Sequence, residues 1–133
     1  MSCIFCKIIS GDIPSMKIYE DNSTLVFMDI AKDVDGHMLA IPKKHVTNIL
    51  DCDNDTLANL MNTVKLVSNH CVEECGYDGV NLLNANGETA GQSVQHFHIH
   101  IIPRRKNDEI NAWPDFKGAK FKIEEIYNEL KTM

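Results

Sequence analysis

Three histidines alternate with apolar residues in the stretch QHFHIHII at residues 95–102, and this alternation limits the local structure strongly. Side chains along a β-strand point alternately to its two faces. A strand here would therefore send Phe97, Ile99 and Ile101 into the core. Because a strand that only faces water needs nothing more than ordinary polar side chains, a row of imidazoles indicates a chemical role. The three histidines that share the opposite face are His96, His98 and His100.

The spacing of this row restricts how a metal ion could use it. At about 3.3 Å per residue, neighbouring histidines lie ~6–7 Å apart and the outer two ~13 Å apart. Since zinc–nitrogen bonds are about 2 Å long, two neighbours could share one ion, but three in a flat strand could hardly do so. At least one imidazole therefore remains available for a role other than metal binding. The alternative interpretation is that the whole face only binds metal or is merely solvated.

The residues before the row supply groups that suit a phosphate. Gly91-Gln92-Ser93 is a glycine turn with an amide, a hydroxyl and backbone N–H groups, and such turns can hold phosphate oxygens. Neutral imidazole is a good nucleophile near pH 7, and a second imidazole can protonate or orient. Phosphoryl or nucleotidyl transfer needs a nucleophile, donors for the phosphate oxygens and a proton source, so the segment predicts a site of this class.

Length and charge exclude several other classes. The chain has 133 residues, which suits one domain, and its formal net charge of −6 argues against bulk binding to nucleic acid or to an anionic membrane. No apolar run approaches the ~18–20 residues of a transmembrane helix, and residues 1–10 do not form a secretory signal. We expect a cytoplasmic protein whose five cysteines are reduced.

Periodicity and turn residues predict an α+β fold built on an antiparallel sheet of about five strands. One long helix and short terminal helices complete it, and Gly11 and Gly76 end the first two helices. Two cysteines of the long helix, Cys71 and Cys75, are expected in the core. Helices are expected at residues 3–10, 53–75 and 122–131, and strands at residues 17–20, 24–29, 37–41, 79–83 and 94–102.

These residues together resemble the histidine triad (HIT) family. The stretch 96–102 fits its His-φ-His-φ-His-φ-φ signature, and AGQS at residues 90–93 precedes it as in that family. Further matches are CIFCKI at residues 3–8, FMDI at residues 27–30 and the stretch at residues 36–45. The similarity runs from Cys3 to Arg104 and is closest to the Hint-like branch with its bacterial, zinc-containing relatives.

The resemblance implies a HIT-like fold, with residues 1–133 as a single HIT domain that carries a short C-terminal tail from about residue 104. It also implies a homodimer whose sheet extends across the interface, with one purine nucleotide site per protomer. Relatives bring their C-terminal segment toward the partner's site, which would give Trp113 a part in substrate choice.

The resemblance further implies a mechanism. His98 would attack the α-phosphorus and carry a transient nucleotidyl group, while His100 contacts the phosphate and His37 supports the histidine cluster. Gln92 and Ser93 match contacts to the phosphate and to the leaving group, whose departure Ser93 would help. The implied substrates are purine nucleoside phosphoramidates or related nucleoside 5′-phosphate derivatives. Histidine rather than glutamine at position 100 favours hydrolysis over transfer.

Nucleotide contacts are implied in the same way. Asp29 matches the acidic residue that takes both ribose hydroxyls, a suitable role for a carboxylate acceptor. Where relatives place an amide side chain near the phosphate this chain has Ala85, so either Asn84 or Asn86 compensates or the phosphate is held less tightly. Six apolar residues match the walls around the base, with a plain core as the alternative: Ile4, Phe5, Ile8, Ile13, Phe27 and Ile30.

The pair Cys3-x-x-Cys6 suits either a metal or a redox role. A thioredoxin-like redox pair would follow a strand in a βαβ unit, which the surrounding residues do not suggest. A closed structural zinc site needs four ligands, and Cys3, Cys6, His45 and His96 resemble the pattern of some bacterial family members. We therefore expect structural Zn²⁺ at one end of the histidine row and phosphate at the other.

Two other functions stay open on the sequence. One is a non-catalytic regulatory module that binds purine nucleotides, in which any hydrolysis is incidental. The other is a dinucleoside polyphosphate hydrolase, which would use the same nucleophile on a different leaving group. Substrate kinetics separate these alternatives from a phosphoramidate hydrolase.

Overall fold

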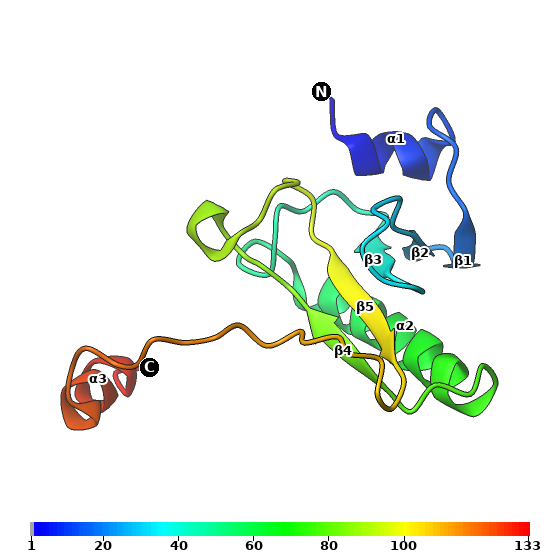
Figure 1. Ribbon diagram of the computed structural model, residues 1–133. Helices are drawn as coiled ribbons and strands as arrows, with labels where there is room; N and C mark the ends of the chain where they lie inside the picture. The colour runs from blue at the N-terminus through cyan, green and yellow to red at the C-terminus, as the bar shows by residue number, and fades with distance from the viewer. Residues whose placement is uncertain (1) are drawn as a thin grey trace.

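The computed structural model describes residues 2–133, which form an α+β fold around one antiparallel sheet (Figure 1). The strand order is β1-β2-β3-β5-β4, so the expected fold class is confirmed. Along the chain the elements are α1 (Ile4–Ser10), β1 (Lys17–Glu20), β2 (Thr24–Met28), β3 (Met38–Pro42), α2 (Asn54–Glu73), β4 (Gly79–Leu83), the 3-10 turn η1 (Glu88–Ala90), β5 (Ile99–Arg104) and α3 (Ile123–Leu130).

The helix ends follow local chemistry. Cys3 is the N-cap of α1, and its sulfur accepts a hydrogen bond from the backbone N–H of Cys6. Gly11 ends α1 with φ of +86°, a left-handed conformation that glycine adopts without strain. The long helix α2 is capped by Asp53 and ends at Glu73, two residues before Cys75. Cys75 is exposed in the following turn, so its predicted place in the core is wrong.

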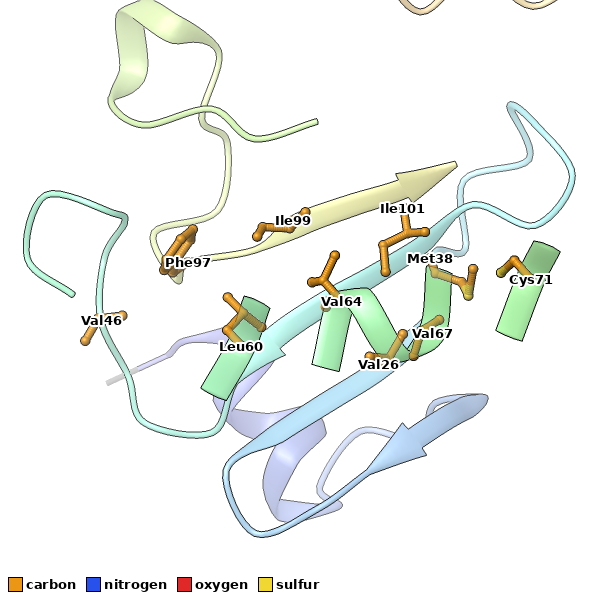
Figure 2. Close-up of a cluster of buried hydrophobic side chains, with 11 residues drawn as sticks. Val26, Met38, Val46, Leu60, Val64, Val67, Cys71, Phe97, Ile99 and Ile101 are labelled. Carbon is orange, nitrogen blue, oxygen red and sulfur yellow. The ribbon is translucent and has the colours of Figure 1, made fainter. Parts of the chain in front are cut away.

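Helix α2 covers one face of the sheet and makes the larger core (Figure 2). Its buried residues Leu60, Val64 and Val67 pack against the central strands. The apolar residues of the histidine stretch lie in this core, which confirms their predicted direction. The sheet side of the cluster consists of Val26, Met38, Ala40, Phe97, Ile99 and Ile101, and Val46 and Cys71 complete it.

Helix α1 covers the opposite face, so the histidine row is not open to bulk water. Phe5 and Ile8 of α1 form a second core cluster with alternate residues of β2 and β3, namely Leu25, Phe27, Leu39 and Ile41. The ring of Phe5 stands edge-on against His96 and His98, with centroids 5.8 and 5.2 Å apart. The imidazoles therefore lie between the sheet and a short helix, in a partly desolvated layer.

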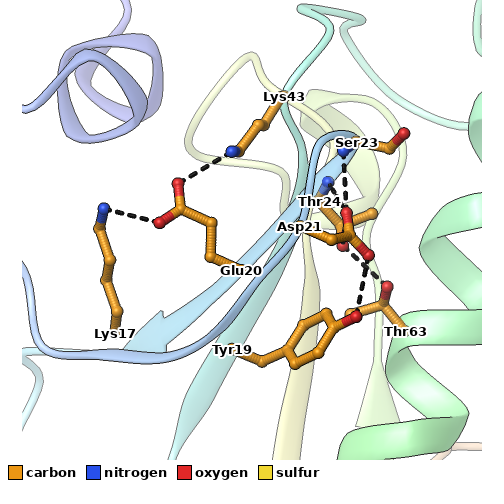
Figure 3. A network of polar contacts seen from close by, with 8 residues as sticks. All are labelled: Lys17, Tyr19, Glu20, Asp21, Ser23, Thr24, Lys43 and Thr63. Atoms are coloured by element: carbon orange, nitrogen blue, oxygen red, sulfur yellow. Dashed lines mark hydrogen bonds and ion pairs between the residues drawn. The ribbon is translucent and has the colours of Figure 1, made fainter.

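A polar network fixes the β1–β2 turn against α2 (Figure 3). Asp21 accepts hydrogen bonds from the backbone N–H groups of Ser23 and Thr24, each at 2.8 Å. The buried hydroxyls of Thr24 and Thr63 are 2.8 Å apart and join β2 to α2. This network fixes the β1–β2 turn and ties β2 to α2.

Strand β5 begins later than predicted, at Ile99 rather than Val94. Strand β3 pairs with β5 only from Met38 to Ala40, so residues 94–98 have no ladder partner. Their backbone groups find other partners: the N–H of Phe97 donates to the carbonyl oxygen of Val46 at 2.8 Å. The predicted alternation of faces still holds, because Phe97 lies in the core beside α2 and His96 and His98 face α1.

Arg105 and Lys106 still donate hydrogen bonds to Gly76 and Asp78 of the domain body, and beyond Ile110 the chain leaves the body as an extended arm that carries α3 (Figure 1). The predicted last helix is confirmed, but its apolar side chains are exposed, as is Trp113 in the arm. Within residues 2–133, no helix combines the length and apolar character needed to cross a bilayer.

Candidate functional site

His98 is held in one ring orientation by its own backbone neighbourhood. Its Nδ1 lies 2.7 Å from the carbonyl oxygen of His96, which can only accept, so Nδ1 carries the proton. The carbonyl oxygen of His98 accepts a hydrogen bond of 2.8 Å from the side-chain amide of Asn84. In the neutral ring this contact leaves the lone pair on the other nitrogen, Nε2, which is the tautomer that a nucleophilic imidazole attacking through Nε2 requires.

A hydrogen-bonded pair, His37 and His100, lies beside this ring. His37 Nε2 and His100 Nδ1 are 2.8 Å apart, and the rings of His98 and His100 have centroids 5.1 Å apart. Burial, and then the neighbouring histidines, lower the pKa of His100. Asp29 Oδ2 is 3.6 Å from His37 Nε2, and Asp33 accepts from His37 Nδ1 at 3.0 Å. Sequence reasoning placed His37 and His100 here but missed Asp33.

A largely apolar cavity of about 380 Å³ is linked to the histidines by two of its lining residues, since Phe5 stands edge-on against His98 and Asp29 lies 3.6 Å from His37. Asp29 lies in its lining, and its Oδ1 accepts from the backbone N–H of Ala31 at 2.8 Å. Ile30 is 90% exposed and forms the rim rather than a buried wall. All six residues expected around a base line this one cavity: Ile4, Phe5, Ile8, Ile13, Phe27 and Ile30.

The side chain of Gln92 is fully engaged in holding its loop. Its oxygen accepts from the N–H of Gly87 at 2.9 Å and from the amide of Asn48 at 3.1 Å. Its amide nitrogen donates to the carbonyl oxygens of Thr47 and Val94 at 2.7 and 3.0 Å. With every donor and acceptor of its side chain occupied, Gln92 supports the turn at residues 91–93, and its side chain has no group left for the phosphate contact expected of it.

The other polar residues expected near the phosphate are spread along two loops. Ser93 is exposed and lines an open groove of about 430 Å³ together with Ile4 and His45. Asn86 accepts from the backbone N–H of Ile49 at 2.8 Å and donates to Asn84. The structure therefore uses both asparagines to join the loops around His98, on either side of Ala85.

Two cysteines and two histidines converge at the other end of the histidine row. The ligand atoms of Cys3, Cys6, His45 and His96 all lie within 4.8 Å of one another. The Nδ1 atom of His96 is 3.3 Å from Cys3 Sγ, 3.6 Å from Cys6 Sγ and 3.1 Å from His45 Nδ1. A tetrahedral zinc ion with bonds of 2.0–2.3 Å requires donor separations of about 3.3–3.8 Å; the two nitrogen–sulfur separations fall in this range, and the nitrogen–nitrogen separation is slightly shorter.

A hydrogen bond at the second ring nitrogen of His96 fixes the tautomer that can bind a metal through Nδ1. Its Nε2 lies 2.8 Å from the carbonyl oxygen of Pro42 and so carries the proton, which leaves Nδ1 free to bind a metal. Burial lowers the pKa of this fully buried imidazole, which keeps it in the neutral form that metals bind. Burial and Cys3 raise the pKa of the Cys6 thiol, a shift that a bound cation would reverse.

Comparison with known proteins places this arrangement in a family. The family model described as HIT domain matches residues 10–107. The chain belongs to the HIT family. Among its relatives is the protein hit of Bacillus subtilis, 43% identical over 128 residues, which cover 96% of this chain and 88% of that protein.

Two further HIT proteins bear on the site. An adenosine 5′-monophosphoramidase of Schizosaccharomyces pombe is 37% identical over 135 residues, covering 99% of this chain and 98% of that protein. A solved structure described as a Zn-bound histidine triad family protein from Mycobacterium smegmatis has a TM-score of 0.79 and 37% identity, covering 86% of this chain and 84% of that one. The fold of this chain is therefore the HIT fold, and its homologues support nucleotide hydrolase activity of the HIT type.

Proposed function

We propose that the chain hydrolyses purine nucleoside phosphoramidates or related nucleoside 5′-phosphate derivatives. The observation that carries this proposal is the ring of His98, which is fixed at Nδ1 and packs edge-on against Phe5, a residue that also lines an apolar cavity with a carboxylate in its lining. The apolar cavity suits a purine, and Asp29 suits the ribose hydroxyls. Turnover of adenosine 5′-phosphoramidate by the purified chain tests the proposal directly.

The reaction would run in two steps. In the first, His98 Nε2 forms a bond to the α-phosphorus while the phosphorus–nitrogen bond breaks, and the departing amine takes a proton from the His37–His100 pair or from Ser93. In the second, water attacks the nucleotidyl-histidine, its proton returns to the same groups, and the nucleoside monophosphate leaves with His98 restored.

Asp29→Asn tests the ribose contact. An amide cannot accept from both ribose hydroxyls as a carboxylate does, so we expect kcat/KM for the ribonucleoside phosphoramidate to fall on the order of 10-fold. The loss should be much smaller for the 2′-deoxy substrate, measured under the same conditions. Equal losses on both substrates would place Asp29 outside ribose recognition.

We also propose that the four-residue cluster binds structural Zn²⁺. Zinc would supply cross-linking only, because four protein donors leave no open position for chemistry. Cys3 and Cys6 would hold α1, and through α1 the walls Ile4, Phe5 and Ile8, against His96 on the sheet side.

Finally, we propose a cytoplasmic homodimer in which the arm packs on a second copy. The arm exposes large apolar side chains that an isolated chain would leave in water, among them Trp113, Phe116 and Phe121. Light scattering should give twice the mass of one chain. A chain shortened after residue 110 should dissociate more readily, and an unchanged equilibrium would show that the arm does not hold the dimer.

A further inference from the structure

The Asp33 carboxylate contacts His37 on the side of its ring that faces away from His100. Its Oδ1 and Oδ2 lie 3.0 and 3.2 Å from His37 Nδ1. Because an ionised carboxylate can only accept, His37 Nδ1 must carry a proton. His37 then has one nitrogen left, Nε2, and this atom meets His100 Nδ1 at 2.8 Å.

These contacts form a continuous line from a carboxylate to a ring in the reaction centre. His37 is buried, with 7% of its surface exposed, whereas the Asp33 side chain is 53% exposed. Three charged or titratable groups face the His37–His100 pair. Asp33 and Asp29 approach His37, Asp29 at 3.6 Å, and the ring of His98 packs against the ring of His100 with centroids 5.1 Å apart. Among residues 2–133, none of the lysines or arginines forms an ion pair with these groups.

We propose that Asp33 is a positioning residue that acts through His37 to hold a proton on the His37–His100 pair next to the nucleotide's phosphate. The inference rests on the proposed function, for which it names the group behind the proton source. A negative charge beside the pair favours its protonated form, whereas burial opposes that form. Asp33 thereby offsets part of the desolvation that disfavours a charged imidazole beside the substrate.

The chemical consequence is a balanced proton cycle. In the first step the pair gives its proton to the departing amine and becomes neutral. The Asp33 carboxylate still accepts a hydrogen bond from His37 Nδ1–H in this neutral state. In the second step the pair regains a proton from the attacking water, and Asp33 stabilises the charge that returns. Asp33 itself neither binds substrate nor loses its charge.

Asp33→Asn tests this role, since an amide keeps the size of the side chain but removes the charge. We expect kcat/KM for adenosine 5′-phosphoramidate to fall about five- to tenfold, because the partner is half exposed, while the Kd for AMP changes less than about twofold. Without the carboxylate the pair loses its proton at lower pH, so the alkaline limb of the rate profile should shift to lower pH. Asp33→Glu should restore much of the rate.

Asp35→Asn is the matched control. Asp35 is exposed in the same loop, its removal changes the net charge equally, and its side chain makes no hydrogen bond within residues 2–133. Its rate and pH profile should equal those of the unaltered protein. If Asp33→Asn behaves like this control, the proposal is wrong.

An NMR readout separates this proposal from the proposed function. Nitrogen-15 shifts of the imidazoles, recorded without substrate, report which ring nitrogen carries a proton and at what pH the pair titrates. We expect His37 Nδ1 to be protonated, and Asp33→Asn to lower the titration midpoint of the pair. If the protein shows no turnover, the proposed function fails, and an unchanged midpoint in this variant would independently overturn the role of Asp33.

Discussion

His98→Asn should reduce turnover of a purine nucleoside phosphoramidate by at least about 10³-fold, because it removes the proposed nucleophile. Asparagine can still donate to the carbonyl oxygen of His96, as the histidine ring does, so the surrounding backbone should persist. The cavity lined by α1 is untouched, and AMP and GMP should bind with a Kd within about threefold of the unaltered value. Steady-state kinetics and calorimetry measure the two effects separately.

A covalent intermediate gives this experiment a second readout. Rapid quenching of the unaltered protein should trap a nucleotidyl group on His98 by mass spectrometry, and the variant should trap none. His70→Asn is the control, since His70 is exposed on α2 and outside the cluster. Full activity of His98→Asn would refute the mechanism.

The competing functions predict different outcomes for the unaltered protein. A regulatory nucleotide-binding module would bind AMP or GMP and show negligible turnover across the substrate panel. A dinucleoside polyphosphate hydrolase would use His98 as well, but diadenosine polyphosphates would be better substrates than phosphoramidates. Side-by-side kcat/KM values therefore decide between the three.

Cys3→Ser should abolish stoichiometric zinc and lower the melting temperature on the order of 10 °C, through the loss of a metal cross-link between α1 and the sheet. The substitution isolates metal binding well, because serine is itself a favoured N-cap and can replace the Cys3 sulfur as acceptor for the N–H of Cys6. Metal content by mass spectrometry and thermal unfolding with and without added zinc check the two parts.

Cys75→Ser is the matched control for the cysteine change, because Cys75 is exposed and lies outside the four-residue cluster of Cys3, Cys6, His45 and His96. It should keep one zinc per chain and an unchanged melting temperature. Protein purified without an affinity tag and found to lack zinc, with no effect of Cys3→Ser, would remove the structural metal from the proposal.

The features that sequence predicted best were those with a fixed period. Alternation along residues 95–102 placed Phe97 in the core and the histidines on the opposite face, and helical spacing placed α2. The CxxC spacing, with His45 and His96 taken from family resemblance, gathered four donors that the structure does bring together. Periodicity works in these cases because each pattern follows directly from backbone geometry.

What sequence could not give depended on pairing partners far along the chain. The start of β5 is set by where β3 stops pairing, and the role of Gln92 by the carbonyl group of Thr47 and the side-chain amide of Asn48. Asp33 sits in a loop where an acidic residue is ordinary. Only the folded chain shows that the Asp33 carboxylate accepts a hydrogen bond from His37 Nδ1. No local sequence signal distinguishes Asp33 from Asp35.

Helix α1 has a consequence that reaches beyond either site. Its N-cap Cys3 and its residue Cys6 belong to the four-residue cluster. Within the same two turns, Ile4, Phe5 and Ile8 line the cavity. An element shared in this way would couple the binding of the proposed zinc ion to that of the proposed nucleotide, and such coupling is reciprocal. If both proposed ligands bind, any free energy that a purine adds to the anchoring of α1 must appear equally as a higher affinity for the ion, so nucleotide concentration would change zinc affinity and zinc would change nucleotide affinity.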